Sequence, residues 1–218
     1  MLIYFILIPV GFYLVVHLPL LLLKENAFSI TGLIRNHINV LFRHAGASDY
    51  HDYASPWWQW PLMKKAVWFY YDMESGTNAK MINFLMNPFL VWAGNIAVLF
   101  GLWFGLKKKD HISILMLLGF ASTFLFWAII GRSQTFQYYY VLPLIFKTIL
   151  LMYVFGLGVS ALKKNHQYLL VSGLVVILSA PFIYFYPIIS AKRITFPEYK
   201  SRMWIDSWGL IPSRPRKN

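Results

Sequence analysis

The chain has 218 residues, of which 58% are hydrophobic and 13% are charged, and its mean hydropathy is +0.53. A soluble fold of this length cannot bury so much apolar surface, and a disordered chain is poor in such residues. The absence of cysteine excludes a disulfide-stabilised scaffold. A polytopic membrane protein remains, and its net charge of +12 and its 19% of aromatic residues need an explanation.

Five apolar stretches are long enough to cross a bilayer, which takes roughly 20 helical residues. They cover residues 1–23, 88–106, 112–131, 138–162 and 168–189. The apolar residues do not alternate as they do in barrel strands, so we predict an all-α polytopic fold with about five transmembrane helices.

The spans divide the chain into four predicted segments. These are a transmembrane helix at 1–23, an external loop at 24–87, a four-helix membrane region at 88–190 and a basic tail at 191–218. The first stretch has no basic region before it and no small-residue cleavage site after it, which argues against a signal peptide. A chain that opens on a bare apolar helix also resembles a piece of a longer protein.

Two short basic loops, 107–111 and 163–166, predict the sidedness of the membrane region. Two spans separate them, so they share one face, and the positive-inside rule assigns that face to the cytoplasm. The loop at 24–87, the turn at 132–137 and the tail then lie outside. The tail is itself basic, which leaves an alternative in which prolines in the last stretch make it re-entrant and the tail cytoplasmic.

The external loop begins with an amphipathic pattern for which Ser29 can supply the N-cap. Apolar residues recur at helical spacing: Ile30, Leu33, Ile34, Ile38, Leu41 and Phe42. The pattern predicts a short helix in the membrane interface that ends near Gly46. His37, His44 and His51 are spaced by seven, wider than a typical zinc pair, so we expect no metal site.

An aromatic run, HDYASPWWQWPL at residues 51–62, follows this helix. It has three tryptophans in four residues, bracketed by Pro56 and Pro61, and therefore predicts no regular helix. One interpretation is an aromatic belt at the membrane interface. The other is a rigid shelf on which a sugar or a lipid chain stacks, with His51 and Ser55 offering hydrogen bonds.

Five motifs in order along the chain carry a family resemblance. They are L-F-R-H at 41–44, H-x-Y-x-S-P-W-W-x-W-P-L at 51–62, N-P followed by W-x-G-N at 87–95, R-S-Q-T-F-Q-Y-Y-Y at 132–140, and Y-x-x-R-M-W-x-x-S-W at 199–208. Together they resemble the C-terminal four-transmembrane region of bacterial protein O-mannosyltransferases, glycosyltransferases of the GT-C type. Arg43 stands where the resemblance leads us to expect tyrosine.

The resemblance implies an inverting transfer of mannose from a polyprenyl-phosphate carrier to a protein Ser or Thr, without a cofactor. It implies a multi-pass protein of the bacterial inner membrane whose active face is extracytoplasmic. The family's catalytic carboxylate belongs to an N-terminal half that is missing here, so we assign no catalytic residue. Four external carboxylates, Asp49, Asp52, Asp72 and Glu74, are interpreted as solvated loop charges.

The expected partners are polyprenyl-phosphate-mannose, membrane lipid, the acceptor protein and the missing half as a separate chain, but no nucleic acid. We predict ten residues that bind carrier or substrate: His51, Tyr53, Ser55, Trp57, Trp58, Trp60, Arg132, Tyr138, Tyr139 and Lys147. Two alternatives stay open, a related polyprenyl-phosphate-sugar transferase acting on lipid or glycan, and a non-catalytic membrane subunit.

Two of these residues are cations at the fourth stretch. Arg132 stands at its mouth, where a guanidinium fork suits a phosphate, although it could also reach a lipid headgroup. Lys147 lies nine residues inside, about 13 Å deep, and no stretch contains an acidic partner. Because a buried charge is costly in a membrane, we expect it to face a carrier phosphate, a carboxylate of the missing half or a watery groove, unless it snorkels.

Overall fold

The computed structural model of the protein describes residues 3–17, 30–45, 51–74, 78–130, 132 and 134–209. These residues belong to two compact units, Met1–Ala47 and Ser48–Asn218, and each unit is treated by itself.

The first unit contains a π-helical turn (Ile3–Leu7), α1 (Ile8–His17) and α2 (Ile30–Ala45). The two α-helices meet where the Tyr13 hydroxyl lies 2.5 Å from Nε2 of His37. The predicted amphipathic helix is confirmed in α2, while Ser29 and Gly46 lie outside the described residues. Of the predicted span at 1–23, the described part ends at His17. Helix α1 accounts for its last 10 described residues.

The second unit contains four helices long and apolar enough to cross a membrane. They are α3 (Pro88–Lys108), α4 (His111–Ile130), a 3₁₀ turn (Gln137–Tyr140) that continues into α5 (Val141–Ser160), and α6 (Lys164–Ile189). They confirm a polytopic, mainly helical membrane fold and match the last four predicted stretches to within a few residues.

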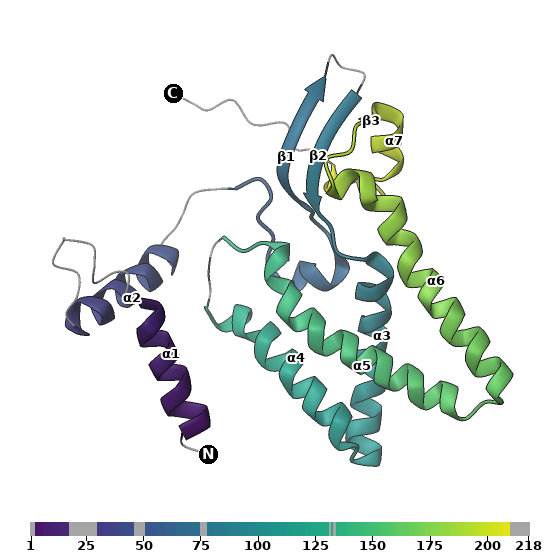
Figure 1. Cartoon of the computed structure of the whole chain (residues 1–218), viewed down its shortest axis with the longest axis horizontal. Coiled ribbons are helices and arrows are strands. Elements are labelled where there is room, and N and C mark those ends of the chain that lie inside the picture. Colours follow the sequence, from purple (N-terminus) through teal and green to yellow (C-terminus); the bar gives the residue numbers. More distant parts are fainter. Residues whose placement is uncertain are drawn as a thin grey trace. The chain divides into compact units, whose positions relative to one another are not determined.

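The connection between α3 and α4 is a tight turn with a cap on each side. Lys109 takes the left-handed conformation, with φ 53°, and its N–H donates to the Phe104 carbonyl, which ends α3. The Asp110 carboxylate then accepts a 2.7 Å hydrogen bond from Ser113 N, which satisfies a donor in the first turn of α4. The helices are therefore held antiparallel at the end of the unit far from the sheet (Figure 1).

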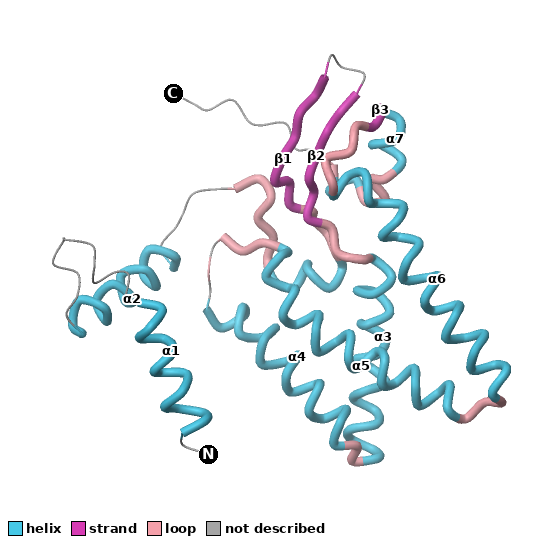
Figure 2. The backbone as a smooth tube through the Cα atoms, viewed as in Figure 1, coloured by secondary structure: helices cyan, strands magenta, loops and turns pink. Residues whose placement is uncertain are grey.

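A small sheet that the sequence did not predict joins the segment before α3 to the tail. Strand β1 (Val67–Glu74) pairs antiparallel with β2 (Asn78–Phe84), which also pairs with the short β3 (Ile194–Thr195) from the tail. Figure 2 shows these strands at one end of the helices. The run VWFYYDME is rich in aromatic residues typical of strands, but its hydrophobic alternation is too irregular to indicate one.

The tail packs against the strands of the segment that precedes α3. Helix α6 runs unbroken through Pro181 and Pro187, and beyond its end Ala191 N donates to the Met81 carbonyl at 3.0 Å. Trp208 is fully buried, and its carbonyl accepts a 3.0 Å hydrogen bond from the Trp68 indole. The re-entrant alternative is therefore wrong, because α6 does not turn back and the tail lies at the same end as the loop (Figure 1).

A capping box fixes the start of helix α7 (Phe196–Ser201) in the tail and makes its stability depend on pH. The Glu198 carboxylate accepts hydrogen bonds from Thr195 N at 2.8 Å and from its hydroxyl at 3.0 Å, and these bonds lower the pKa of Glu198 below its usual 4.5. A lowered folded-state pKa means that this contribution is complete above pH 4.5 and is lost as the pH falls through the folded pKa.

We therefore expect faster amide hydrogen exchange at Thr195 and Glu198 on acidification below pH 4.5, after correction for the intrinsic rate. The matched variant is Glu198→Gln, which keeps a capping acceptor but does not titrate, so its corrected exchange should not change with pH. The same acid response in both proteins would contradict the assignment.

Candidate functional site

The aromatic run forms a six-residue 3₁₀ helix, Trp57–Leu62, rather than an α-helix. Trp60 points inward, is 1% exposed, and donates its indole N–H to the carbonyl and the hydroxyl of Ser55 at 3.2 and 3.1 Å. Its ring packs edge-on against Trp127 of α4, with the centroids 5.7 Å apart. Trp58 points outward, is 51% exposed and lies under the Lys64 ammonium.

The aromatic run and the Arg/Tyr-rich turn are fastened to each other. Ser55 N donates to the Thr135 carbonyl at 2.8 Å, and the Thr135 hydroxyl donates to the Ser55 carbonyl at 2.7 Å. Both residues are buried, and a hydrogen bond in such a low-dielectric interior is stronger than one exposed to water. Beside them the His51 ring packs edge-on against Phe136 at 5.0 Å. Two motifs 80 residues apart therefore form a single site.

The turn presents a cation on an aromatic stack. The Arg132 guanidinium carbon lies 5.5 Å from the centroid of Tyr139, a cation–π contact. Tyr139 stacks on Trp127 with the centroids 4.3 Å apart, and Tyr138 stacks on Phe136 at 5.3 Å. The aromatic stack therefore supports the arginine side chain through Tyr139.

A groove of about 590 Å³ opens beside this stack, between α4 and the start of α5. Trp127, Tyr138 and Tyr139 line it, together with aliphatic residues, while Ser122 and Thr123 add hydroxyls. Phe69 of β1 reaches Tyr138 with a 6.3 Å centroid separation, so the hairpin borders the same aromatic cluster. An apolar groove with a cation on one of its lining rings suits an amphipathic lipid carrying an anionic group.

Lys147 has an environment that the sequence did not predict. Its side chain is fully buried, and its ammonium donates to Asn95 Oδ1 at 2.7 Å and to the Tyr140 hydroxyl at 2.6 Å. Gly94 makes room for it, because a Cβ at that position would lie 2.6 Å from Lys147 Cε. The contacts that the structure shows for this ammonium are two neutral oxygens of its own chain.

Asn95 connects this buried lysine to the aromatic run. Its Nδ2 donates to the Pro61 carbonyl at 2.9 Å, while its Oδ1 accepts from Lys147. In the sequence Asn95 is visible only as the last residue of the W-x-G-N motif, which by itself predicts no role for it. The available signal was the pair Gly94-Asn95 inside an apolar span, where a buried amide needs partners.

The ten predicted binding residues thus fall into three groups. Seven surround the joined run and turn or its stack: His51, Tyr53, Ser55, Trp60, Arg132, Tyr138 and Tyr139. Trp57 packs on Phe124 of α4, and Trp58 lies on the outer side of the run. Lys147 is directed into the helix bundle. No group of three or more metal-ligating side chains occurs within the described parts of the chain.

A comparison with protein-family models shows the family of this chain. A family model described as the C-terminal four TMM region of protein-O-mannosyltransferase matches residues 29–208. The chain belongs to this family. The match covers the aromatic run, the turn, all four spans of the second unit and the packed tail, and it confirms the resemblance drawn from the motifs.

Two relatives of the family can be compared over most of the chain. The chain is 24% identical over 196 residues to the polyprenol-phosphate-mannose–protein mannosyltransferase of Corynebacterium glutamicum. The matched region covers 83% of this chain and 37% of that protein. It also resembles a chain of the S. cerevisiae protein O-mannosyltransferase Pmt1-Pmt2 complex, solved bound to the sugar donor. That match has a TM-score of 0.67 at 21% identity and covers 86% of this chain and 28% of that one. The chain therefore spans about a third of the length of these relatives, and it shares the fold of the matched part of the yeast chain.

Proposed function

We propose that this chain is the C-terminal membrane portion of a glycosyltransferase that moves mannose from a polyprenyl-phosphate carrier to Ser or Thr of a protein. The carrying observation is the joined run and turn, in which Arg132 lies on the ring of Tyr139, a residue that lines the aromatic groove. The kinship with mannosyltransferases supports the reaction class. We further propose the extracytoplasmic face of a bacterial inner membrane as the place of the reaction.

The groove and the arginine would have separate tasks. The polyprenyl chain would lie along the apolar wall near Trp127 and Tyr139, which excludes water from the carrier. The Arg132 guanidinium would hold the phosphate and stabilise the charge that grows on it as mannose departs. Trp58 would offer an exposed ring face to a sugar or to the acceptor.

The transfer itself exchanges one bond for another. The acceptor oxygen attacks C1 of mannose, the bond from C1 to the phosphate oxygen breaks, and polyprenyl phosphate leaves with the bonding electron pair. A carboxylate must take the hydroxyl proton. We assign it to a part of the transferase outside this chain, because the matching family model describes only a C-terminal membrane region and the chain covers 37% of its bacterial relative.

Arg132→Ala should weaken binding of polyprenyl-phosphate-mannose by about 10- to 100-fold, since a hydrogen-bonded charge contributes roughly 1.5–3 kcal/mol. Arg132→Lys should give an intermediate loss, because the ammonium keeps the charge without the fork. Binding is measured on the chain in nanodiscs containing the labelled carrier. Lys164→Ala at the start of α6, at the other end of the helices, is the matched charge control.

Equal losses for Arg132→Ala and Lys164→Ala would refute the phosphate role. The acceptor is tested separately in the full transferase, with a Ser/Thr peptide, a lipid and a glycan offered in turn. Transfer to the lipid or glycan alone would favour the related polyprenyl-phosphate-sugar transferase. Carrier binding with no transfer to any acceptor would favour a non-catalytic membrane subunit.

A further inference from the structure

A second groove lies at the opposite end of the helices from the aromatic run. It has a volume of about 390 Å³, is formed by α3 and α4, and shares no lining residue with the first groove. Its walls are apolar throughout and include Val98, Leu102, Leu106, Leu118 and Ala121. Gly105 deepens it, because a Cβ at that position would lie 3.2 Å from Ile114 Cγ1.

The length of the groove indicates what it can hold. Along α3 its lining runs from Val98 to Leu106, which at 1.5 Å per residue is about 12 Å. This is less than half of the roughly 30 Å of a bilayer's hydrocarbon core, so the groove lies within one leaflet. A partner helix that crosses the membrane would pack along both leaflets, whereas one acyl chain matches a groove confined to one.

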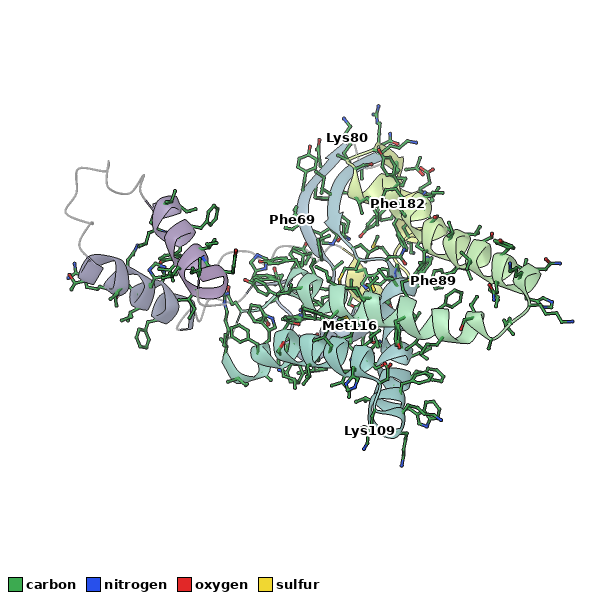
Figure 3. The ribbon with its side chains drawn as sticks, turned by 60° about the horizontal axis from the view of Figure 1, so that its bottom comes forward. Phe69, Lys80, Phe89, Lys109, Met116 and Phe182 are labelled. Atoms are coloured by element: carbon green, nitrogen blue, oxygen red, sulfur yellow. The ribbon has the colours of Figure 1, made fainter. Side chains whose placement is uncertain are left out.

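The charge next to the groove indicates the headgroup. Lys107, Lys108 and Lys109 follow Leu106 directly at the end of α3. Figure 3 shows Lys109 at this end of the unit and Lys80 of the hairpin at the other. The neighbouring Asp110 carboxylate is engaged by Ser113 N and by the Tyr153 hydroxyl, each at 2.7 Å. The turn therefore offers a cluster of cations to the headgroup layer.

We propose that this groove and turn bind an anionic phospholipid of the leaflet that contains the α3–α4 connection. One acyl chain occupies the groove, and the lysines bind the headgroup phosphate. The Lys108 ammonium lies 5.8 Å above the Trp103 ring, which keeps its stem along the helix surface. The site is independent of the carrier site proposed above and does not require transferase activity.

The test measures lipids that stay bound to the chain by native mass spectrometry after extraction from nanodiscs of equal phosphatidylglycerol and phosphatidylcholine. We expect one retained phosphatidylglycerol in preference to phosphatidylcholine. The double substitution Lys107→Gln/Lys108→Gln should reduce retention about tenfold, because each basic residue near a headgroup contributes to the attraction. The matched control is Lys163→Gln/Lys164→Gln, which removes the same charge from the α5–α6 connection, away from the groove.

The groove itself is tested by filling it. Ala121→Phe should reduce retention as strongly as the lysine pair, whereas Ala128→Phe, further along α4 and outside the groove, should have no effect. Equal loss in the two lysine pairs would overturn the proposal in favour of nonspecific charge. The proposal would also be overturned by unchanged lipid retention in Ala121→Phe or by equal retention of the two lipids. It would likewise be overturned if another membrane helix occupied the groove and no lipid were retained.

Discussion

Replacing Asn95 by leucine should lower the free energy of unfolding by about 2–3 kcal/mol, although it makes α3 more apolar. Asn95 gives one of the two oxygens that the buried Lys147 ammonium contacts, at 2.7 Å. Without it a charged group inside the bundle keeps the Tyr140 hydroxyl at 2.6 Å but loses its other acceptor. The cost is the desolvation of a charge that is no longer compensated.

Removing the other partner of this hydrogen bond, by Lys147→Met, should lower the free energy of unfolding by less than Asn95→Leu does. It removes the charge together with its need for acceptors, and methionine fills a similar volume against Gly94. The double variant should therefore be more stable than Asn95→Leu alone. Thermal unfolding in detergent measures this, with a midpoint lowered by roughly 5–10 °C for Asn95→Leu. Additive losses in the double variant would contradict the coupling.

Asn95→Asp separates the two bonds that Asn95 makes. A carboxylate still accepts from Lys147 but cannot donate to the Pro61 carbonyl, which Asn95 reaches at 2.9 Å. The fold should keep its stability while the aromatic run loosens. If the run shapes the carrier site, carrier binding falls in this variant without a fall in the unfolding midpoint.

Trp60→Ala should have the largest effect of any change in the aromatic run, about 3–5 kcal/mol of stability. The ring is 1% exposed, packs on Trp127 and donates to Ser55 at 3.1 Å. Removing it leaves a cavity at the point where the run, the turn and α4 meet. Carrier binding should therefore be lost together with the fold, as followed by thermal unfolding and a nanodisc binding assay.

Trp58→Ala is the matched control for this prediction, because its ring is 51% exposed on the same short helix. It should change stability by less than about 0.5 kcal/mol, as surface changes usually do. If the exposed ring meets a sugar or the acceptor, transfer by the full enzyme decreases while stability stays. A similar loss of stability in both variants would contradict the inward and outward orientation of the two tryptophans.

Much of the membrane architecture follows from local composition. A helix must satisfy its own backbone in lipid, so each apolar run of about 20 residues indicates one span, and the runs from 88 to 189 correspond to α3–α6. The lysine pattern also grouped the loop, the turn and the tail on one face. The contacts between Ser55 and Thr135 and between Trp68 and Trp208 agree with that grouping.

The sequence alone therefore determined that this is a membrane protein and where its last four spans lie. It also grouped the aromatic run and the turn on the same face. Only the tertiary structure decided the partners. The tail strand at Ile194 pairs with Ala79, far away along the chain, and no local pattern encodes such a pairing. The sequence predicted a phosphate, a carboxylate or a watery groove for Lys147, whereas the oxygens of its own chain that it meets depend on how α3 packs against α5. A buried ammonium donates to whichever oxygens the packing brings within reach, here those of Asn95 and Tyr140.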